Sequence, residues 1–253
     1  MDRGVDYSGA VVKGFPLRRP TALAWALLLS GLAAFISLGA WQHGRAGFKR
    51  ALIAEHEAAG QSDPVEWQRG MAAPDAPRFA RVRVRGEWLA PRYLLDNQSR
   101  DGRTGVEDFA PLLLADGEVV LVGLGFLTYA DGRRTLPPLP PVPDGGSGVT
   151  GLATPPPAHG LRLGGDWSAG QGAGPVRLMP WFDLAAIAAD LGRPVAARVV
   201  RVDEAPGSPW RRDWRPVEAV PPERHLAYAL QWWTMALAVL VIFLVVNRRT
   251  QPS

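Results

Sequence analysis

The chain of 253 residues contains no cysteine. This absence excludes disulfide bonds, thiolate metal ligands and cysteine nucleophiles, and with them copper delivery through paired thiols. Histidine is scarce, with four residues, and His, Asp and Glu show no spacing typical of a zinc site or a hydrolytic centre. The formal net charge is only +4, with acidic and basic residues interleaved. The sequence therefore indicates neither a hydrolytic or zinc-dependent centre nor a nucleic-acid-binding protein.

Two apolar runs lie near the ends of the chain. Residues 21–41 and 224–246 each reach the roughly 20 residues that a helix needs to cross a bilayer. Aromatic residues gather at the start of the second run, as is typical of the headgroup region. A cleaved secretory signal is the alternative for the first run, but its length and the Trp41-Gln42 exit favour a retained anchor.

Basic residues predict the orientation. Lys13, Arg18 and Arg19 precede the first run, while Arg248 and Arg249 follow the second, so both ends are expected in the cytoplasm. We expect the inner membrane of a bacterium, with the bilayer itself as a partner. The predicted segments are a cytoplasmic tail over 1–20, a transmembrane helix over 21–41, a periplasmic β-rich domain over 42–223, a transmembrane helix over 224–246 and a cytoplasmic tail over 247–253.

The middle of the chain has the pattern of a β domain. Alternation over 78–89 predicts a half-buried strand, and Phe109 to Tyr129 predicts a hairpin around Asp116-Gly117. The sequence predicts an antiparallel β-rich domain with one or two helices between the two transmembrane helices. Further strands are expected at 92–97, 149–154, 161–163 and 195–203, helices at 48–59 and 181–191, and a linker at 206–222 with Trp210 and Trp214 near the membrane.

Three stretches of the chain carry a family pattern. They are Leu38 to Arg45 with Lys49 and Leu52, Val84 to Trp88 with Gly105, Ala110 to Leu112, Asp116-Gly117 and Val119 to Val122, and His225 to Trp233. In the same helix–domain–helix order, they resemble the surfeit locus proteins, the Surf family of cytochrome c oxidase assembly factors. Two departures concern the domain surface and its partner contacts: Gly123 to Phe126 replaces an Asn-Arg-Gly-Trp run, and Glu223 stands where asparagine is common.

The resemblance implies a non-enzymatic factor for maturation of the oxidase. Some bacterial members are implicated in binding haem a and passing it to oxidase subunit I. Subunit I and haem a synthase are therefore expected partners, and haem a an expected transient cofactor. A membrane scaffold without cofactor, which stabilises oxidase subunits, is the alternative. An unrelated membrane-anchored enzyme or sensor is disfavoured because no nucleophile–base set is present.

His225 corresponds to the family's candidate axial ligand to the haem iron. On a helix, Tyr228, Ala229 and Trp232 share its face; Ala229 leaves room, and the two aromatic rings can wall a flat macrocycle. Arg45 and Arg224 are expected at the same membrane level, where they suit anionic haem propionates. The plainer interpretation is an interfacial aromatic belt. His43 lies at a similar depth, either as a second axial ligand or as an ordinary interfacial histidine.

Overall fold

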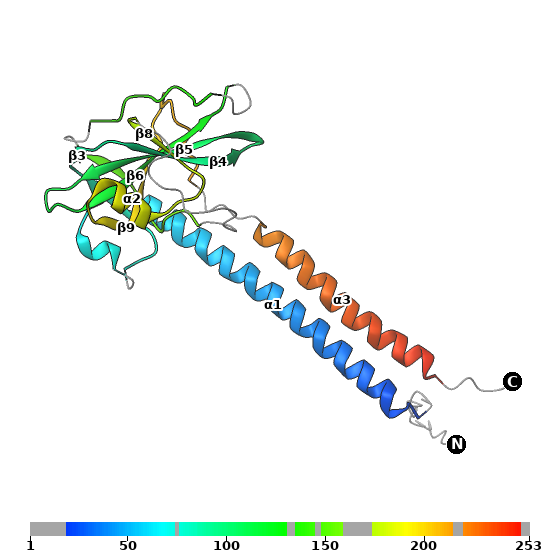
Figure 1. The fold of residues 1–253 in the computed structure, drawn as a ribbon. Coiled ribbons are helices and arrows are strands. Elements are labelled where there is room, and N and C mark those ends of the chain that lie inside the picture. The colour runs from blue at the N-terminus through cyan, green and yellow to red at the C-terminus, as the bar shows by residue number, and fades with distance from the viewer. Residues whose placement is uncertain are drawn as a thin grey trace, which may run out of the picture. The chain divides into compact units, whose positions relative to one another are not determined.

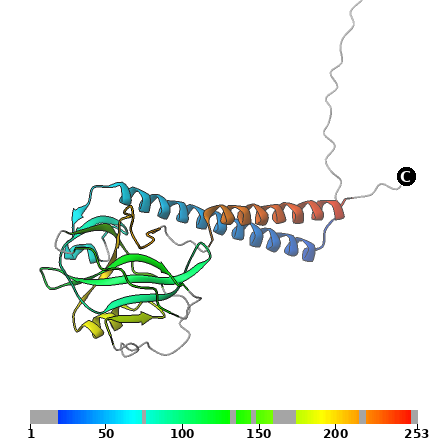
Figure 2. The ribbon, with the colours of Figure 1, turned by 90° about the horizontal axis from the view of Figure 1, so that it is seen from above.

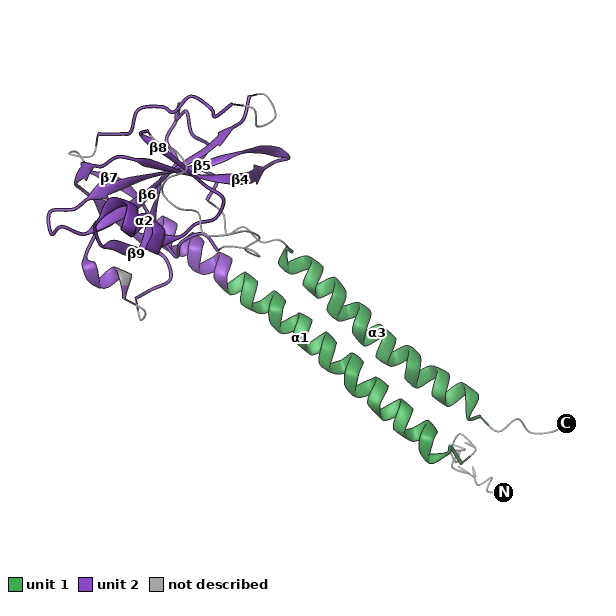
Figure 3. Cartoon of the chain, viewed as in Figure 1, with its two compact units in different colours: residues 1–51, 218–253 green, residues 52–217 purple. Residues whose placement is uncertain are grey.

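A computed structural model describes residues 19–73, 76–130, 135–144, 148–158, 174–214 and 220–248. The chain divides into two compact units, residues 1–51 with 218–253 and residues 52–217 (Figure 3). We call them the helix pair and the β domain. The strand predicted at 161–163 lies outside the described residues, as does nearly all of the glycine-rich stretch 164–174.

The helix pair contains most of α1 (Ala22–Gln61) and all of α3 (Pro222–Val246), which lie side by side in both views (Figures 1 and 2). Thr21 begins α1 by accepting a hydrogen bond from the backbone N–H of Ala24 at 3.1 Å. Pro222 occupies the first turn of α3, where its missing N–H costs nothing. Both helices are long and apolar enough to cross a membrane.

The helix predicted at 48–59 is the second half of α1 rather than a separate element. At 1.5 Å per residue, this 40-residue helix is about 60 Å long, whereas a bilayer core is about 30 Å thick. The last part of α1, from Leu52 onward, belongs to the β domain.

The β domain is built on a nine-stranded sheet with the order β1-β2-β7-β9-β6-β5-β4-β8, and β3 pairs with β5. The prediction of a purely antiparallel sheet is wrong, because β1 with β2, β4 with β8 and β6 with β9 run parallel. Alternation in a sequence reports which face of a strand is buried, not the direction of its neighbours. The strands are β1 (Val65–Glu66), β2 (Ala80–Val84), β3 (Glu87–Trp88), β4 (Arg92–Arg100), β5 (Arg103–Leu113), β6 (Val119–Thr128), β7 (Val149–Thr154), β8 (Val176–Met179) and β9 (Val195–Val202).

The predicted hairpin is confirmed as β5 and β6. Gly117 has φ +82°, the left-handed conformation that a tight turn requires, and the Asp116 side chain accepts a hydrogen bond from the Glu118 N–H at 3.0 Å. Strands β7 and β9 also lie where they were expected. The short strand β8 was not predicted.

The predicted helix at 181–191 is α2 (Leu184–Leu191). Asp183 caps its first turn by accepting from the N–H groups of Ala185 and Ala186, and Gly192 ends it at φ 61°. Ile187 of α2 is fully buried in one of two core clusters, with Tyr93, Phe109, Leu121 and Val199 of the sheet. The larger cluster is formed by the alternate residues of the same strands, such as Leu94, Val122 and Val200.

The segment predicted as a linker at 206–222 instead packs into the β domain up to Trp214. Trp210 is 6% exposed and donates its Nε1–H to Asp108 at 2.8 Å. The backbones of Phe126 and Arg211 exchange hydrogen bonds of 2.8 and 3.0 Å. Gly125 has φ +140°, and a Cβ there would lie 2.5 Å from the Cβ of Trp210. The stretch that departs from the Surf pattern, Gly123 to Phe126, thus receives this returning segment.

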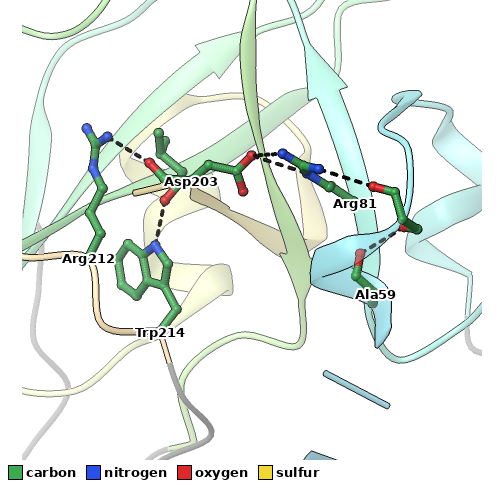
Figure 4. Close-up of polar contacts among 7 residues, drawn as sticks. Ala59, Arg81, Asp203, Arg212 and Trp214 are labelled. Atoms are coloured by element: carbon green, nitrogen blue, oxygen red, sulfur yellow. Dashed lines mark hydrogen bonds and ion pairs between the residues drawn. The ribbon is translucent and has the colours of Figure 1, made fainter. Parts of the chain in front are cut away.

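Hydrogen bonds at the end of β9 hold the segment that enters the β domain after α1 and the segment that leaves it at 210–214 (Figure 4). Arg81 donates to Asp203 Oδ2 at 2.8 Å and to the Ser62 carbonyl, just beyond α1, at 3.2 Å. On the outgoing side, Arg212 donates to the Asp203 carbonyl at 2.9 Å, and Trp214 Nε1–H donates to the Val202 carbonyl at 2.6 Å. Val202 and Asp203 therefore hold the outgoing segment directly and the incoming segment through Arg81 of β2.

Candidate functional site

The facing sides of α1 and α3 form a stripe with three- and four-residue steps, the spacing of a two-helix seam. We call these residues the seam. They are Leu28, Gly31, Phe35, Gly39, Gln42, Ala46 and Lys49 on α1, and Pro222, His225, Ala229, Trp232, Ala236, Val239 and Phe243 on α3, all of them partly or fully buried.

The two helices run antiparallel along the seam. Phe35 stacks on Trp232 with ring centroids 5.8 Å apart and an interplanar angle of 24°. Towards one end Trp25 packs against Phe243 at 5.0 Å. In a membrane such packing, rather than the hydrophobic effect, holds helices together.

Gly39 allows a close approach between the helices. A Cβ at this position would lie 2.2 Å from Nε1 of Trp233, a distance that no pair of unbonded atoms tolerates. The tryptophan ring therefore lies directly on the backbone of α1. This contact is one turn away from the polar residues that occupy the seam.

His225 and Gln42 face each other across the seam. The distance from His225 Nδ1 to Gln42 Oε1 is 2.6 Å. Because Gln42 Oε1 faces the ring and can only accept, this contact is a hydrogen bond when Nδ1 carries the proton, and Nε2 of the neutral ring then carries the lone pair. Nε2 is buried and has no hydrogen-bond partner within the part of the chain that the structure describes. Leaving a buried polar atom unpaired costs about 1–3 kcal/mol, so such an atom needs an explanation.

Lys49 lies at the same end of the seam. The residue is only 7% exposed. Its ammonium donates a hydrogen bond of 2.6 Å to the carbonyl of Val220, two residues before α3 begins. The polar residues of the seam are thus gathered where α3 starts.

The other predicted site residues lie around this end in different settings. Tyr228 points away from the seam and is 47% exposed. Trp232 is in the seam against Phe35. The exposed Arg45 places its guanidinium carbon 5.6 Å from the ring centroid of Phe48, and Arg224 is exposed in the first turn of α3.

Two neighbouring residues, Ala229 and His43, lie in different settings. Ala229 is only 1% exposed because it packs in the seam, so it does not leave open space beside His225. His43 is exposed, with its ring 5.9 Å from Trp233. The structure brings His225 together with Gln42, a residue that is not among the predicted site residues.

The described residues contain no group of three His, Asp or Glu side chains able to hold a metal ion. A haem iron differs from such a site because the porphyrin supplies four ligands and the protein adds one or two axial ones. The single unpaired imidazole nitrogen of His225 fits that requirement.

A model described as the SURF1 family matches residues 29–237. The match runs from the first turns of α1 through the β domain to the middle of α3, and it includes both His225 and Gln42. No curated protein matches the chain.

Proposed function

We propose, from the premise that this chain belongs to the SURF1 family, that it binds haem a and aids its insertion into subunit I of cytochrome c oxidase. The family consists of cytochrome c oxidase assembly factors rather than enzymes. A role in oxidase assembly follows from membership. The handling of haem a is our proposal, and it depends on one observation in the helix pair.

That observation is the unpaired Nε2 of His225. The ring is held through Nδ1 by Gln42, which leaves the lone pair of Nε2 free to bind iron. His225 would hold a haem through this lone pair, and the haem would supply the iron centre. A buried nitrogen with no partner gains more from such a bond than an exposed one, because it gives up no bond to water.

Neighbouring residues suit the rest of a haem molecule. Arg45 and Arg224 have exposed guanidinium groups that can pair with propionates. The N-terminal end of α3 adds a partial positive charge at the same level. Tyr228, three residues after His225, has an exposed aromatic side chain, whereas Trp232 keeps its stack on Phe35.

Burial of Nε2 also bears on how long haem would stay bound. The neighbouring side chains must move before iron reaches the nitrogen. Haem binding therefore competes with the closed packing of the seam, which favours temporary binding over permanent retention. Temporary binding is what transfer to another protein requires.

For topology we propose that both termini are cytoplasmic and that residues 42–223 lie in the periplasm of a bacterial inner membrane. The basic residues outside the two apolar runs support this orientation. The end of the helix pair that contains His225, where α3 begins, would then lie at the periplasmic surface. Haem a synthase is the proposed donor and subunit I the proposed acceptor.

The test is the visible spectrum of the full-length protein purified from cells that make haem a. We expect wild type to carry haem, His225→Ala to lose most of it, and the control His43→Ala to retain it. Circular dichroism of each variant checks that the helices are intact. Wild type without haem, or full occupancy in His225→Ala, would overturn the proposal.

The same variants distinguish haem handling from a scaffold without cofactor. If the chain is only a scaffold, His225→Ala should restore oxidase levels fully in a deletion strain. If it handles haem a, that variant should leave oxidase deficient in haem although the variant protein accumulates normally.

A further inference from the structure

The seam contains one polar side chain other than Lys49 from each helix. These are Gln42 and His225, and they bond to each other. Polar residues at seam positions are costly, and they persist where they fix register or serve a site. A hydrogen bond for register needs only Nδ1 of the histidine, so register does not explain the unpaired Nε2.

We infer that Gln42 is a positioning residue that fixes the tautomer and ring orientation of His225, so that Nε2 is the nitrogen presented to iron. This inference rests on the proposed haem binding. It adds a specific role for a residue on the other helix. Gln42 touches neither iron nor porphyrin in this role, because it acts through the imidazole.

With Gln42 Oε1 facing the ring, the geometry favours one neutral tautomer. With the proton on Nε2, the lone pair of Nδ1 would face the lone pairs of Gln42 Oε1 across 2.6 Å, which is repulsive. A doubly protonated ring would keep the bond to Gln42 but would bury an Nε2–H group without an acceptor. The neutral ring with its proton on Nδ1 satisfies both constraints.

The position of Gln42 is itself fixed by small seam residues on either side. Gly39, one turn before it, lies against Trp233, and Ala46, one turn after it, is fully buried. The helix backbone therefore lies close to α3 here. The short glutamine side chain consequently reaches the imidazole directly.

An amide partner also sets the strength of the iron ligand. A carboxylate in this place would pull the Nδ1 proton more strongly and make Nε2 more basic. A neutral amide leaves the histidine a weaker donor to iron. This choice suits a protein that must release its haem again.

The first test needs no haem. Nitrogen-15 NMR of histidine-labelled full-length protein in detergent distinguishes a protonated ring nitrogen from a bare one. The chain has four histidines, and His225→Ala identifies the signals of residue 225. We expect a single tautomer protonated at Nδ1 in wild type and a mixture in Gln42→Leu. A single unchanged tautomer in Gln42→Leu would overturn the inference.

The second test uses haem a with purified variants. Gln42→Leu should weaken haem binding about 10-fold or more, within the usual range for loss of a residue that orients a metal ligand. Gln42→Glu should retain haem and lower its midpoint potential, because a more basic imidazole stabilises ferric iron. Gln231→Leu removes a glutamine from an exposed position of α3 and should change neither property.

The outcomes separate the two proposals. If wild type binds no haem but Gln42→Leu still changes the tautomer, haem binding fails while the positioning effect stands. If Gln42→Leu merely destabilises the helix pair, haem occupancy falls in proportion to folded protein and the midpoint potential of bound haem stays the same. That second result would show a structural tie and overturn the inference.

Discussion

Asp108 in the β domain and His225 in the helix pair are both buried polar side chains, but their surroundings differ. Asp108 is fully buried, and both of its oxygens are bonded: Arg92 donates two hydrogen bonds, and Trp210 donates a third. His225 has one partner for two ring nitrogens. A satisfied buried group stabilises a fold, whereas a half-satisfied one retains the capacity to bind something else.

Three other buried side-chain atoms of the described chain lack hydrogen bonds, and all lie in the β domain: His56 Nε2, Glu107 Oε1 and Arg201 Nε. Their side chains nevertheless have close neighbours. Glu107 lies 3.6 Å from Arg201 and 3.7 Å from Arg100, and the Arg201 guanidinium lies 5.0 Å from the ring centroid of Trp214. His225 differs because its unpaired nitrogen is at the mouth of a helix pair with exposed arginines nearby.

The largest expected effect on stability comes from Asp108, whose hydrogen bonds are complete. Asp108→Ala leaves the Arg92 guanidinium buried without its counter-charge and should lower the free energy of unfolding by about 3–5 kcal/mol. Urea titration of the full chain in detergent, followed by tryptophan fluorescence, measures this. Asp101→Ala removes the exposed partner of Arg211 and serves as the control. Equal effects of the two variants would contradict the structural role of Asp108.

A smaller loss of stability is expected when the packing of the seam is disturbed. Gly39→Leu drives a side chain into Trp233 and should cost about 1–3 kcal/mol of helix packing. The chain lacks cysteine, so the pair Gly31→Cys and Val239→Cys can report proximity by disulfide formation without background. Gly39→Leu should reduce the yield of this crosslink. Gly44→Leu, at a glycine with open space around it, should leave the yield unchanged.

The smallest expected effect is the contribution of His56 to the pH dependence of the stability of the β domain. Burial lowers the pKa of His56 from its usual 6.5, and the nearby Arg201 lowers it further. This histidine, at the end of α1 beyond the proposed span 21–41, is neutral in the folded state. Its contribution to stability is present above pH 6.5 and is lost as pH falls through the lowered pKa. Wild type should therefore lose more stability than His56→Gln between pH 7.5 and pH 5.5, as measured by thermal unfolding. Equal losses would contradict this assignment.

The outline of the fold was predictable because short stretches of sequence determine it. Two apolar runs gave the helices, Asp116-Gly117 gave the hairpin, and Asp183 with Gly192 gave the bounds of α2. The parallel strand pairs were not predictable, because alternation is the same for parallel and antiparallel neighbours. The packing of Trp210 was also missed. Its partners Asp108 and Gly125 are about 100 residues earlier, and a tryptophan close to an apolar run looks interfacial.

The candidate site was predictable only in part. The position of His225 at the start of an apolar run was visible, and so was its helical face. Residues three and four positions away fit that face equally well, so the sequence could not show that Ala229 faces α1 whereas Tyr228 faces outward. The partner Gln42 depends on the register of the two helices. That register is set by contacts such as those of Gly39 with Trp233 and Phe35 with Trp232.

The most direct measurement of the central claim is the coupling between iron and a nitrogen-15 label in the haem-loaded, full-length protein. Histidine-labelled wild type should show a strong hyperfine coupling from one directly bound imidazole nitrogen, and His225→Ala should lose that coupling while His43→Ala retains it. Absence of any histidine nitrogen from the iron in wild type, or an unchanged coupling in His225→Ala, would contradict the account.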